Sequence, residues 1–132
     1  MSARILVIDD NADFLEVVVY LLQSNGYTVL IARNGRDGLK TAQQEQPDLI
    51  LTDLMLPWLN GYEICTMLKQ DQRYQQIPIV ILSATKTQAT DERLAKECGA
   101  DAFVLKTIDR QELLKAIQAI LLAPRSSTPA AK

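Results

Sequence analysis

The alternation of short apolar runs with segments of helical periodicity is the feature that most restricts how this chain can fold. Each run is rich in Ile, Val and Leu, which is typical of strands that are buried on both faces. Five such units in strict strand-helix order predict a mainly parallel sheet, covered by helices on both faces and joined by right-handed crossovers. The expected strands are residues 4–8, 27–32, 49–51, 77–82 and 102–105.

Capping residues and glycines mark the helices between these strands. Asn11 or Asp13 can cap the first helix, which Gly26 ends. Further helices are expected at residues 37–46, 61–70 and about 89–97, and Asp109 opens the last one with a capping-box pattern. The residues expected to face the core are Phe14, Val17, Val18, Leu21 and Leu22, then Ile64, Met67 and Leu68, then Leu94 and Ala95, and finally Leu113, Leu114, Ile117, Ile120 and Leu121. The natural strand order is 2-1-3-4-5, a flavodoxin-like α/β fold with five helices.

The length of 132 residues fits one domain with a single core. We expect this domain to occupy residues 1–122. Residues 123–132 are rich in Pro, Ser and Ala, with nothing to bury, and are expected to form a flexible tail.

Charge and composition exclude several classes of function. The net charge of -2 gives no basic surface for direct binding of nucleic acid or an anionic membrane. The chain has no histidine, which excludes a Ser-His-Asp triad and a histidine metal ligand. The N-terminal apolar run is too short for a signal peptide, and no run approaches membrane-spanning length. Cys65 and Cys98 fall in separate helices, so we expect free thiols and a cytoplasmic protein.

Polar residues stand at the carboxyl ends of the expected strands. Asp9 and Asp10 end the first strand and Asp53 the third, whereas Ser83 and Lys106 end the fourth and fifth. The carboxyl ends of parallel strands share one edge of the sheet, so these side chains should meet in one crevice. Singly, each aspartate would more often be a turn former or a helix cap; the combination points to a site.

Three neighbouring carboxylates repel one another. Either they share a proton, which raises an apparent pKa, or a divalent cation neutralises them. Oxygen ligands without His or thiolate select Mg²⁺, which keeps positions open for phosphate oxygens. Lys106 and Ser83 suit a phosphoryl group, and the set fits a carboxylate nucleophile that accepts one.

Four motifs in this chain resemble the receiver domain of bacterial two-component response regulators. They are ILVIDD, DLILTDLMLPWLNGYE, IPIVILSA and GADAFVLK, and the resemblance extends from residue 4 to about 122. It implies a single-domain response regulator that is phosphorylated by a histidine kinase or phosphotransfer protein and then binds a downstream protein. It also allows a dimer linked to phosphorylation, and it implies no turnover enzyme.

The resemblance implies a role for each site residue. Asp53 is the phosphoacceptor, Asp9 and Asp10 hold Mg²⁺, and the backbone carbonyl of Met55 completes the protein ligands. Ser83 is similar to the family's switch hydroxyl, Lys106 to its phosphate-binding lysine and Phe103 to its switch aromatic. Phosphorylation then remodels the face formed by the fourth helix, fifth strand and fifth helix. Trp58, expected to be half exposed, has no chemical role.

Two departures from the family pattern stand beside the site. Thr107 follows Lys106 where the family has proline after a cis peptide, so this loop is either strained or trans. Met55 and Thr85 occupy the positions at which the family tunes dephosphorylation. Met55 cannot orient a water, which predicts slow hydrolysis of the acyl phosphate.

Three alternative functions remain at this point. A flavin carrier shares the fold, but the acidic loop after residue 8 would repel its phosphate. An aspartyl phosphatase would place a second acid at position 55, where this chain has Met. The chain could also be the receiver half of a DNA-binding regulator, although nothing in it resembles a recognition helix.

Overall fold

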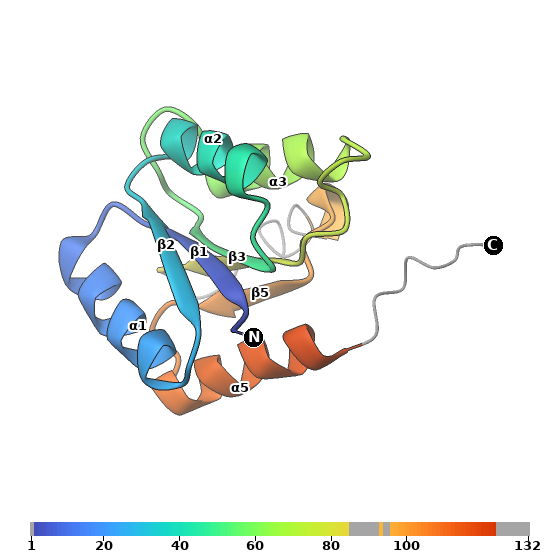
Figure 1. Ribbon diagram of the computed structural model, residues 1–132. Helices are drawn as coiled ribbons and strands as arrows, with labels where there is room; N and C mark the ends of the chain where they lie inside the picture. Colours follow the sequence, from blue (N-terminus) through green and yellow to red (C-terminus); the bar gives the residue numbers. More distant parts are fainter. Residues whose placement is uncertain (1, 85–92, 94–95, 124–132) are drawn as a thin grey trace.

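Five parallel strands form one sheet in the computed structural model, which describes residues 2–84, 93 and 96–123 (Figure 1). The strand order is β2-β1-β3-β4-β5, as predicted. The strands are β1 (Arg4–Ile8), β2 (Thr28–Ala32), β3 (Leu49–Asp53), β4 (Ile79–Ser83) and β5 (Ala102–Leu105). The helices are α1 (Ala12–Ser24), α2 (Gly35–Glu45), α3 (Gly61–Lys69) and α5 (Arg110–Leu122), and residues 93 and 96–98 are also helical.

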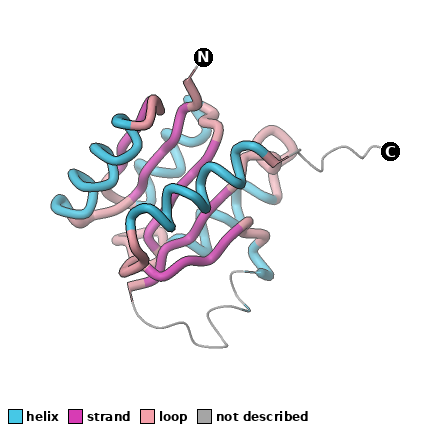
Figure 2. Tube along the Cα trace, turned by 90° about the horizontal axis from the view of Figure 1, so that it is seen from below, coloured by secondary structure: helices cyan, strands magenta, loops and turns pink. Residues whose placement is uncertain are grey.

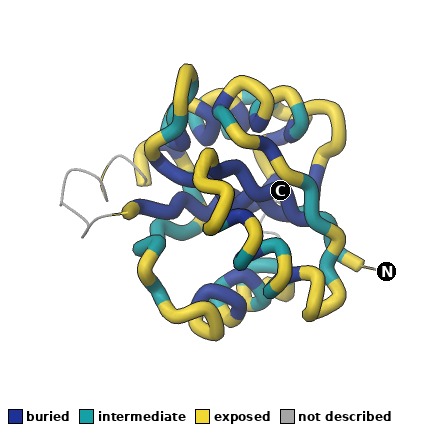
Figure 3. Tube along the Cα trace, turned by 90° about the vertical axis from the view of Figure 1, so that its left-hand side faces the viewer, coloured by how far each residue is buried: buried dark blue, intermediate teal, exposed yellow. Residues whose placement is uncertain are grey.

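The helices lie in two layers, with α1 and α5 on one face of the sheet and α2 and α3 on the other (Figure 1). Seen from the side of α1 and α5, these two helices lie in front of the strands (Figure 2). Successive residues of a strand point to opposite faces, so Ile5 and Val7 pack in one core cluster, whereas Leu6 and Ile8 pack in the other. The central strands β3 and β4 are buried throughout, between exposed outer helix faces (Figure 3).

The strand register places the carboxyl ends of β1, β3, β4 and β5 next to one another. Ile8 pairs with Thr52, Asp53 with Leu82, and Ser83 with Leu105. The residues that end β1, β3, β4 and β5 therefore lie side by side at one edge of the sheet, as the sequence predicted.

Asparagine and aspartate side chains begin the helices. Asn11, rather than Asp13, caps α1 by accepting from the Phe14 N–H at 2.9 Å, and Asp109 caps α5. The prediction that the second helix begins at Asp37 was wrong, because Asn34 accepts from the Asp37 N–H and the helix starts at Gly35. A side chain at Gly35 would collide with the Leu59 carbonyl, so glycine is required there.

Other boundaries also differ from the predictions. Strand β4 starts at Ile79 rather than Ile77, since pairing with β3 begins at Ile79 and Pro78 supplies only its carbonyl. Met67 is exposed rather than inward, and Cys65 takes the buried place beside Ile64 and Leu68. The expectations for Leu94, Ala95, Thr85 and most of the helix at 89–97 lie outside the described residues, as do those for residues 124–132.

Within the described ranges, no helix is long and apolar enough to cross a membrane.

Candidate functional site

Three carboxylates meet at the carboxyl edge of the sheet. Asp9, Asp10 and Asp53 each offer an oxygen, and these three oxygens all lie within 4.8 Å of one another. Asp9 is 0% exposed and Asp53 is 6% exposed, whereas Asp10 faces solvent. The backbone of Asp9 is tied to β2, since its N–H donates to the Ala32 carbonyl at 3.1 Å.

The two oxygens of Asp9 have different partners. Its Oδ1 accepts from the Asn11 N–H at 2.9 Å. Its Oδ2 is buried and forms an ion pair with the Lys106 Nζ at 2.8 Å, in a geometry outside that of a regular hydrogen bond. A buried anionic oxygen in a set of hard donors is suited to a divalent cation such as Mg²⁺.

Lys106 places a positive charge between two of the carboxylates. Its Nζ lies 2.8 Å from Asp9 Oδ2 and 3.5 Å from Asp53 Oδ2. Its backbone N–H donates to the Ser83 carbonyl at 2.7 Å, which fixes the end of β5 against β4. The peptide that joins Lys106 to Thr107 is trans, so the trans alternative holds for this loop.

The environment of Asp53 favours its neutral form. Burial raises the pKa of Asp53 to about 6, and the negative charge of Asp9 adds to the rise, whereas Lys106 lowers this pKa. The direction agrees with the expectation that crowded carboxylates without a metal raise an apparent pKa. The carboxylate is still ionised at neutral pH, as a nucleophile must be.

The remaining predicted residues lie around this cluster. Ser83 is the buried last residue of β4. The Met55 side chain is 72% exposed and points no polar group at the site. Phe103 is partly buried in β5 and packs against the core cluster on the α2 and α3 face. Asp13 is exposed in the first turn of α1, outside the group of three carboxylates.

Sequence reasoning missed the role of Phe14 at this site and assigned it only to the core. The Lys106 Nζ lies 4.6 Å from the centre of the Phe14 ring, in cation–π contact. The only available signal was its place in the first helical turn after the acidic pair. Trp58 also differs from expectation, because it is 73% exposed and has a left-handed φ of 71°.

The two cysteines lie together in the core, away from the acidic edge. Both are free thiols, as predicted, and both are buried. The Cys65 Sγ donates to the Cys98 carbonyl at 3.3 Å. Burial and the hydrogen bond with Cys98 raise the pKa of the Cys65 thiol.

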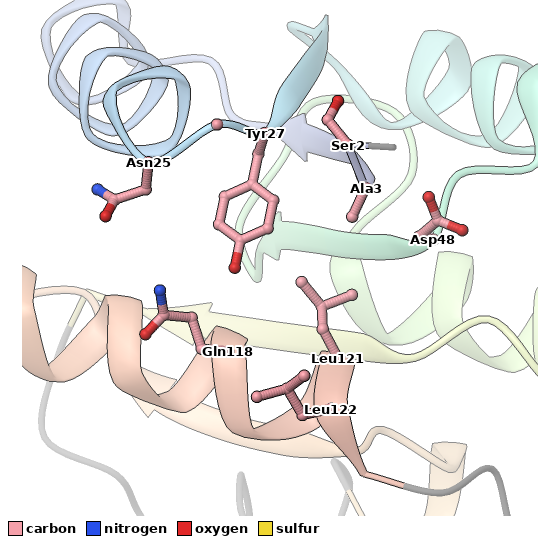
Figure 4. A pocket seen from close by; sticks show the side chains of 9 residues that line it. Ser2, Ala3, Asn25, Tyr27, Asp48, Gln118, Leu121 and Leu122 are labelled. Atoms are coloured by element: carbon pink, nitrogen blue, oxygen red, sulfur yellow. The ribbon is translucent and has the colours of Figure 1, made fainter.

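An open cleft lies near the opposite, amino-terminal edge of the sheet (Figure 4). It has a volume of about 810 Å³ and contains none of the predicted site residues. Two of its polar groups bond within the protein: the Ser2 hydroxyl bonds to that of Thr28 at 2.7 Å, and Asp48 accepts from the Arg4 N–H at 2.7 Å. The group of three carboxylates lies at the other, carboxyl edge of the sheet.

Comparison with known sequences relates the whole domain to one family. The model of the response regulator receiver domain matches residues 5–118. The chain is 40% identical over 119 residues to protein PilH of Pseudomonas aeruginosa, covering 90% of this chain and 98% of PilH. It is 36% identical to the transcriptional regulatory protein PhoP of Bacillus subtilis, and it spans 54% of that protein's length. It is 37% identical to the DNA-binding response regulator MtrA of Mycobacterium tuberculosis, of which it spans 51%.

Solved structures share the fold. A CheY-like receiver domain from Methanospirillum hungatei superposes with a TM-score of 0.85 at 26% identity, covering 92% of this chain and 94% of that one. The receiver domain of a sensor histidine kinase from Pseudomonas aeruginosa, which has a magnesium ion in its active-site cleft, gives 0.84 at 27% identity, with 93% and 100% coverage. These matches agree with the sheet order. The chain belongs to the response regulator receiver domain family of two-component signalling.

Proposed function

We propose that Asp53 accepts a phosphoryl group from a phosphohistidine on a sensor histidine kinase or a phosphotransfer protein. A carboxylate oxygen of Asp53 forms the new bond to phosphorus while the bond from phosphorus to the histidine nitrogen breaks. The electron pair of that bond stays on the nitrogen, which takes up a proton. The observation that carries the proposal is the meeting of Asp9, Asp10 and Asp53 within 4.8 Å, beside the ammonium of Lys106.

Burial distinguishes Asp53 from its neighbours as the acceptor. Asp9 is 0% exposed, so a donor on another protein has no access to it. Asp10 is exposed and has no ion pair with Lys106 among the described contacts. Asp53 is 6% exposed and ends β3 next to both Asp9 and Lys106. Asp53 is therefore the carboxylate that a donor can reach and that also lies beside a lysine and a second acid.

The donor set fits Mg²⁺, with Asp9, Asp10, Asp53 and the backbone carbonyl of Met55 as protein ligands. A bound Mg²⁺ supplies positive charge to the oxygens of a phosphoryl group. Lys106 would add a charge on the other side, and the Ser83 hydroxyl would hydrogen-bond a phosphoryl oxygen. Phe103 would then follow Ser83 and change the surface that a downstream protein binds, or through which two copies pair.

The chain is a signalling domain, and its family membership removes the flavin-carrier and phosphatase alternatives. Self-phosphorylation from a donor and slow self-hydrolysis are part of the proposal, as is a cytoplasmic location, which the two free thiols support. Near-complete coverage of PilH favours a receiver that acts alone. The half coverage of PhoP and MtrA is the observation that keeps a DNA-binding output domain as the second candidate.

Incubation with Mg²⁺ and acetyl phosphate, followed by mass spectrometry of the intact protein, tests the acceptor. The wild type should gain one phosphoryl group, and Asp53→Asn should gain none. Asp13→Asn is a matched control, because Asp13 is exposed and lies outside the group of three carboxylates. A phosphoryl group on Asp53→Asn, or equal labelling after chelation of Mg²⁺, would refute the assignment.

A further inference from the structure

The ammonium of Lys106 is enclosed by acids on one side and by an aromatic ring. Asp9 and Asp53 lie 2.8 Å and 3.5 Å from Nζ, and the centre of the Phe14 ring lies 4.6 Å from it. The lysine side chain is 16% exposed. Little water therefore reaches the charge, and the ring face replaces part of the lost hydration.

The position of Phe14 is linked to that of Asp9 through two hydrogen bonds. The Asn11 N–H donates to Asp9 Oδ1 at 2.9 Å, and the Phe14 N–H donates to Asn11 Oδ1 at 2.9 Å. The ring and the carboxylate thus belong to one local frame at the start of α1. These hydrogen bonds therefore fix both the carboxylate and the ring that contact the Lys106 ammonium.

The loop that carries Lys106 controls its backbone better than its side chain. The Lys106 N–H donates to the Ser83 carbonyl at 2.7 Å, and the Ile108 N–H donates to the Leu105 carbonyl at 3.0 Å. The next residue is Thr107, joined by a trans peptide. A lysine on this backbone still has a long, flexible stem. The position of its ammonium therefore depends on side-chain contacts rather than on the loop.

We infer that Phe14 is a positioning residue that holds the Lys106 ammonium between Asp9 and Asp53. A ring face attracts a cation over a broad area rather than along one direction. The ammonium can therefore move from Asp9 toward a phosphoryl group on Asp53 without leaving the ring. The inference rests on the proposed function of Lys106 and assigns the residue that prepares it.

Two substitutions at Phe14 separate the effect of the aromatic ring from the effect of the side chain's size. Phe14→Leu keeps an apolar side chain but removes the ring, whereas Phe14→Tyr keeps a ring face. Phosphorylation by acetyl phosphate with Mg²⁺ should slow about threefold to tenfold in Phe14→Leu and stay near wild type in Phe14→Tyr. Tyr20→Leu is the matched control, because Tyr20 is an α1 aromatic that is 75% exposed.

The ring-current shift of the Lys106 side chain is a readout that does not depend on activity. In NMR spectra, the Lys106 Cε protons should resonate upfield in the wild type, Phe14→Tyr and Tyr20→Leu, and near random-coil values in Phe14→Leu. In a Lys106→Met background, Phe14→Leu should cause no further loss of rate, since its partner is absent.

Each result has a defined meaning. Unshifted Lys106 protons in the wild type would overturn the inference. It would also be overturned if Phe14→Leu slowed phosphorylation as much in the Lys106→Met background as it does in the wild type. Equal phosphorylation of Phe14→Leu and wild type would do the same. A wild type that shows the upfield shift but gains no phosphoryl group on Asp53 would instead refute the proposed function.

Discussion

The carboxylate of Asp53 is ionised at neutral pH in a place that disfavours its charge. Its folded-state pKa of about 6 lies above the ordinary value of 3.8, chiefly through burial. The folded protein thus binds this proton more tightly than the unfolded chain, so its contribution to stability is present at low pH. That contribution is lost as the pH rises from about 4 through about 6.

Asp53→Asn should therefore stabilise the protein at neutral pH. The expected gain is about 3 kcal/mol in the free energy of unfolding at pH 7, and it should shrink toward zero near pH 4. Urea unfolding of the wild type and of Asp53→Asn at several pH values measures the gain at pH 7 and its decrease toward pH 4. Saturating Mg²⁺ should close the gap at pH 7 by stabilising the wild type. A gain that does not vary with pH would contradict the raised pKa.

Met55 should determine how long the phosphoryl group survives. Its apolar side chain is 72% exposed, two residues after Asp53, and cannot orient an attacking water. The acyl phosphate should persist for minutes or longer, and Met55→Asn should shorten its life because an amide can hold the water. Mass spectrometry at intervals after removal of the donor measures the decay. Loss within seconds in the wild type would refute slow self-hydrolysis.

Trp58 carries backbone strain in the loop that follows Asp53. A φ of 71° is unfavourable for a bulky residue and natural for glycine. The ring is 73% exposed, with the Arg36 guanidinium 5.9 Å from its centre. Trp58→Gly should leave the melting temperature unchanged or raise it. Trp58→Ala, which loses the ring but keeps the strain, is the control, and a drop for glycine larger than for alanine would contradict this account.

At the scale of the element, helix α3 depends on a cap that works in both directions. Asn60 accepts from the Glu63 N–H at 2.9 Å, and Glu63 accepts from the Asn60 N–H at 2.9 Å. Asn60→Ala should lower the free energy of unfolding by about 1 kcal/mol. Glu63→Ala removes only the bond from the Asn60 N–H to the Glu63 carboxylate and should lower the free energy of unfolding by less. Thermal unfolding checks the order, and equal losses would argue against the cap.

The elements whose patterns were unambiguous could be predicted from the sequence. Strands 4–8 and 102–105 were predicted with their observed bounds, because each run begins and ends sharply. The error at Met67 arose because Cys65 fits the same helical face, and cysteine is as readily buried as a small apolar residue. The early start assigned to β4 arose because Ile77 is buried without being paired.

At the scale of the molecule, the topology could be predicted together with the meeting of the strand ends. Parallel order alone brings Asp9, Asp53 and Lys106 to one edge. Burial and distance could not be predicted, and the sequence gives no sign that Asp9 would be sealed from solvent. Contact between Phe14 and Lys106 depends on how α1 lies against the sheet, which local patterns do not encode.

The two buried thiols make this protein well suited to site-specific labelling. The sequence has two cysteines, and both are enclosed in the core, with the pKa of Cys65 raised by burial. Thiol reagents act on the thiolate, so the folded protein should resist maleimide at neutral pH. One cysteine introduced at an exposed position of α5, such as Glu112, would then carry a single fluorophore. Through that dye, a phosphorylated receiver could report directly on the arrival of its partner.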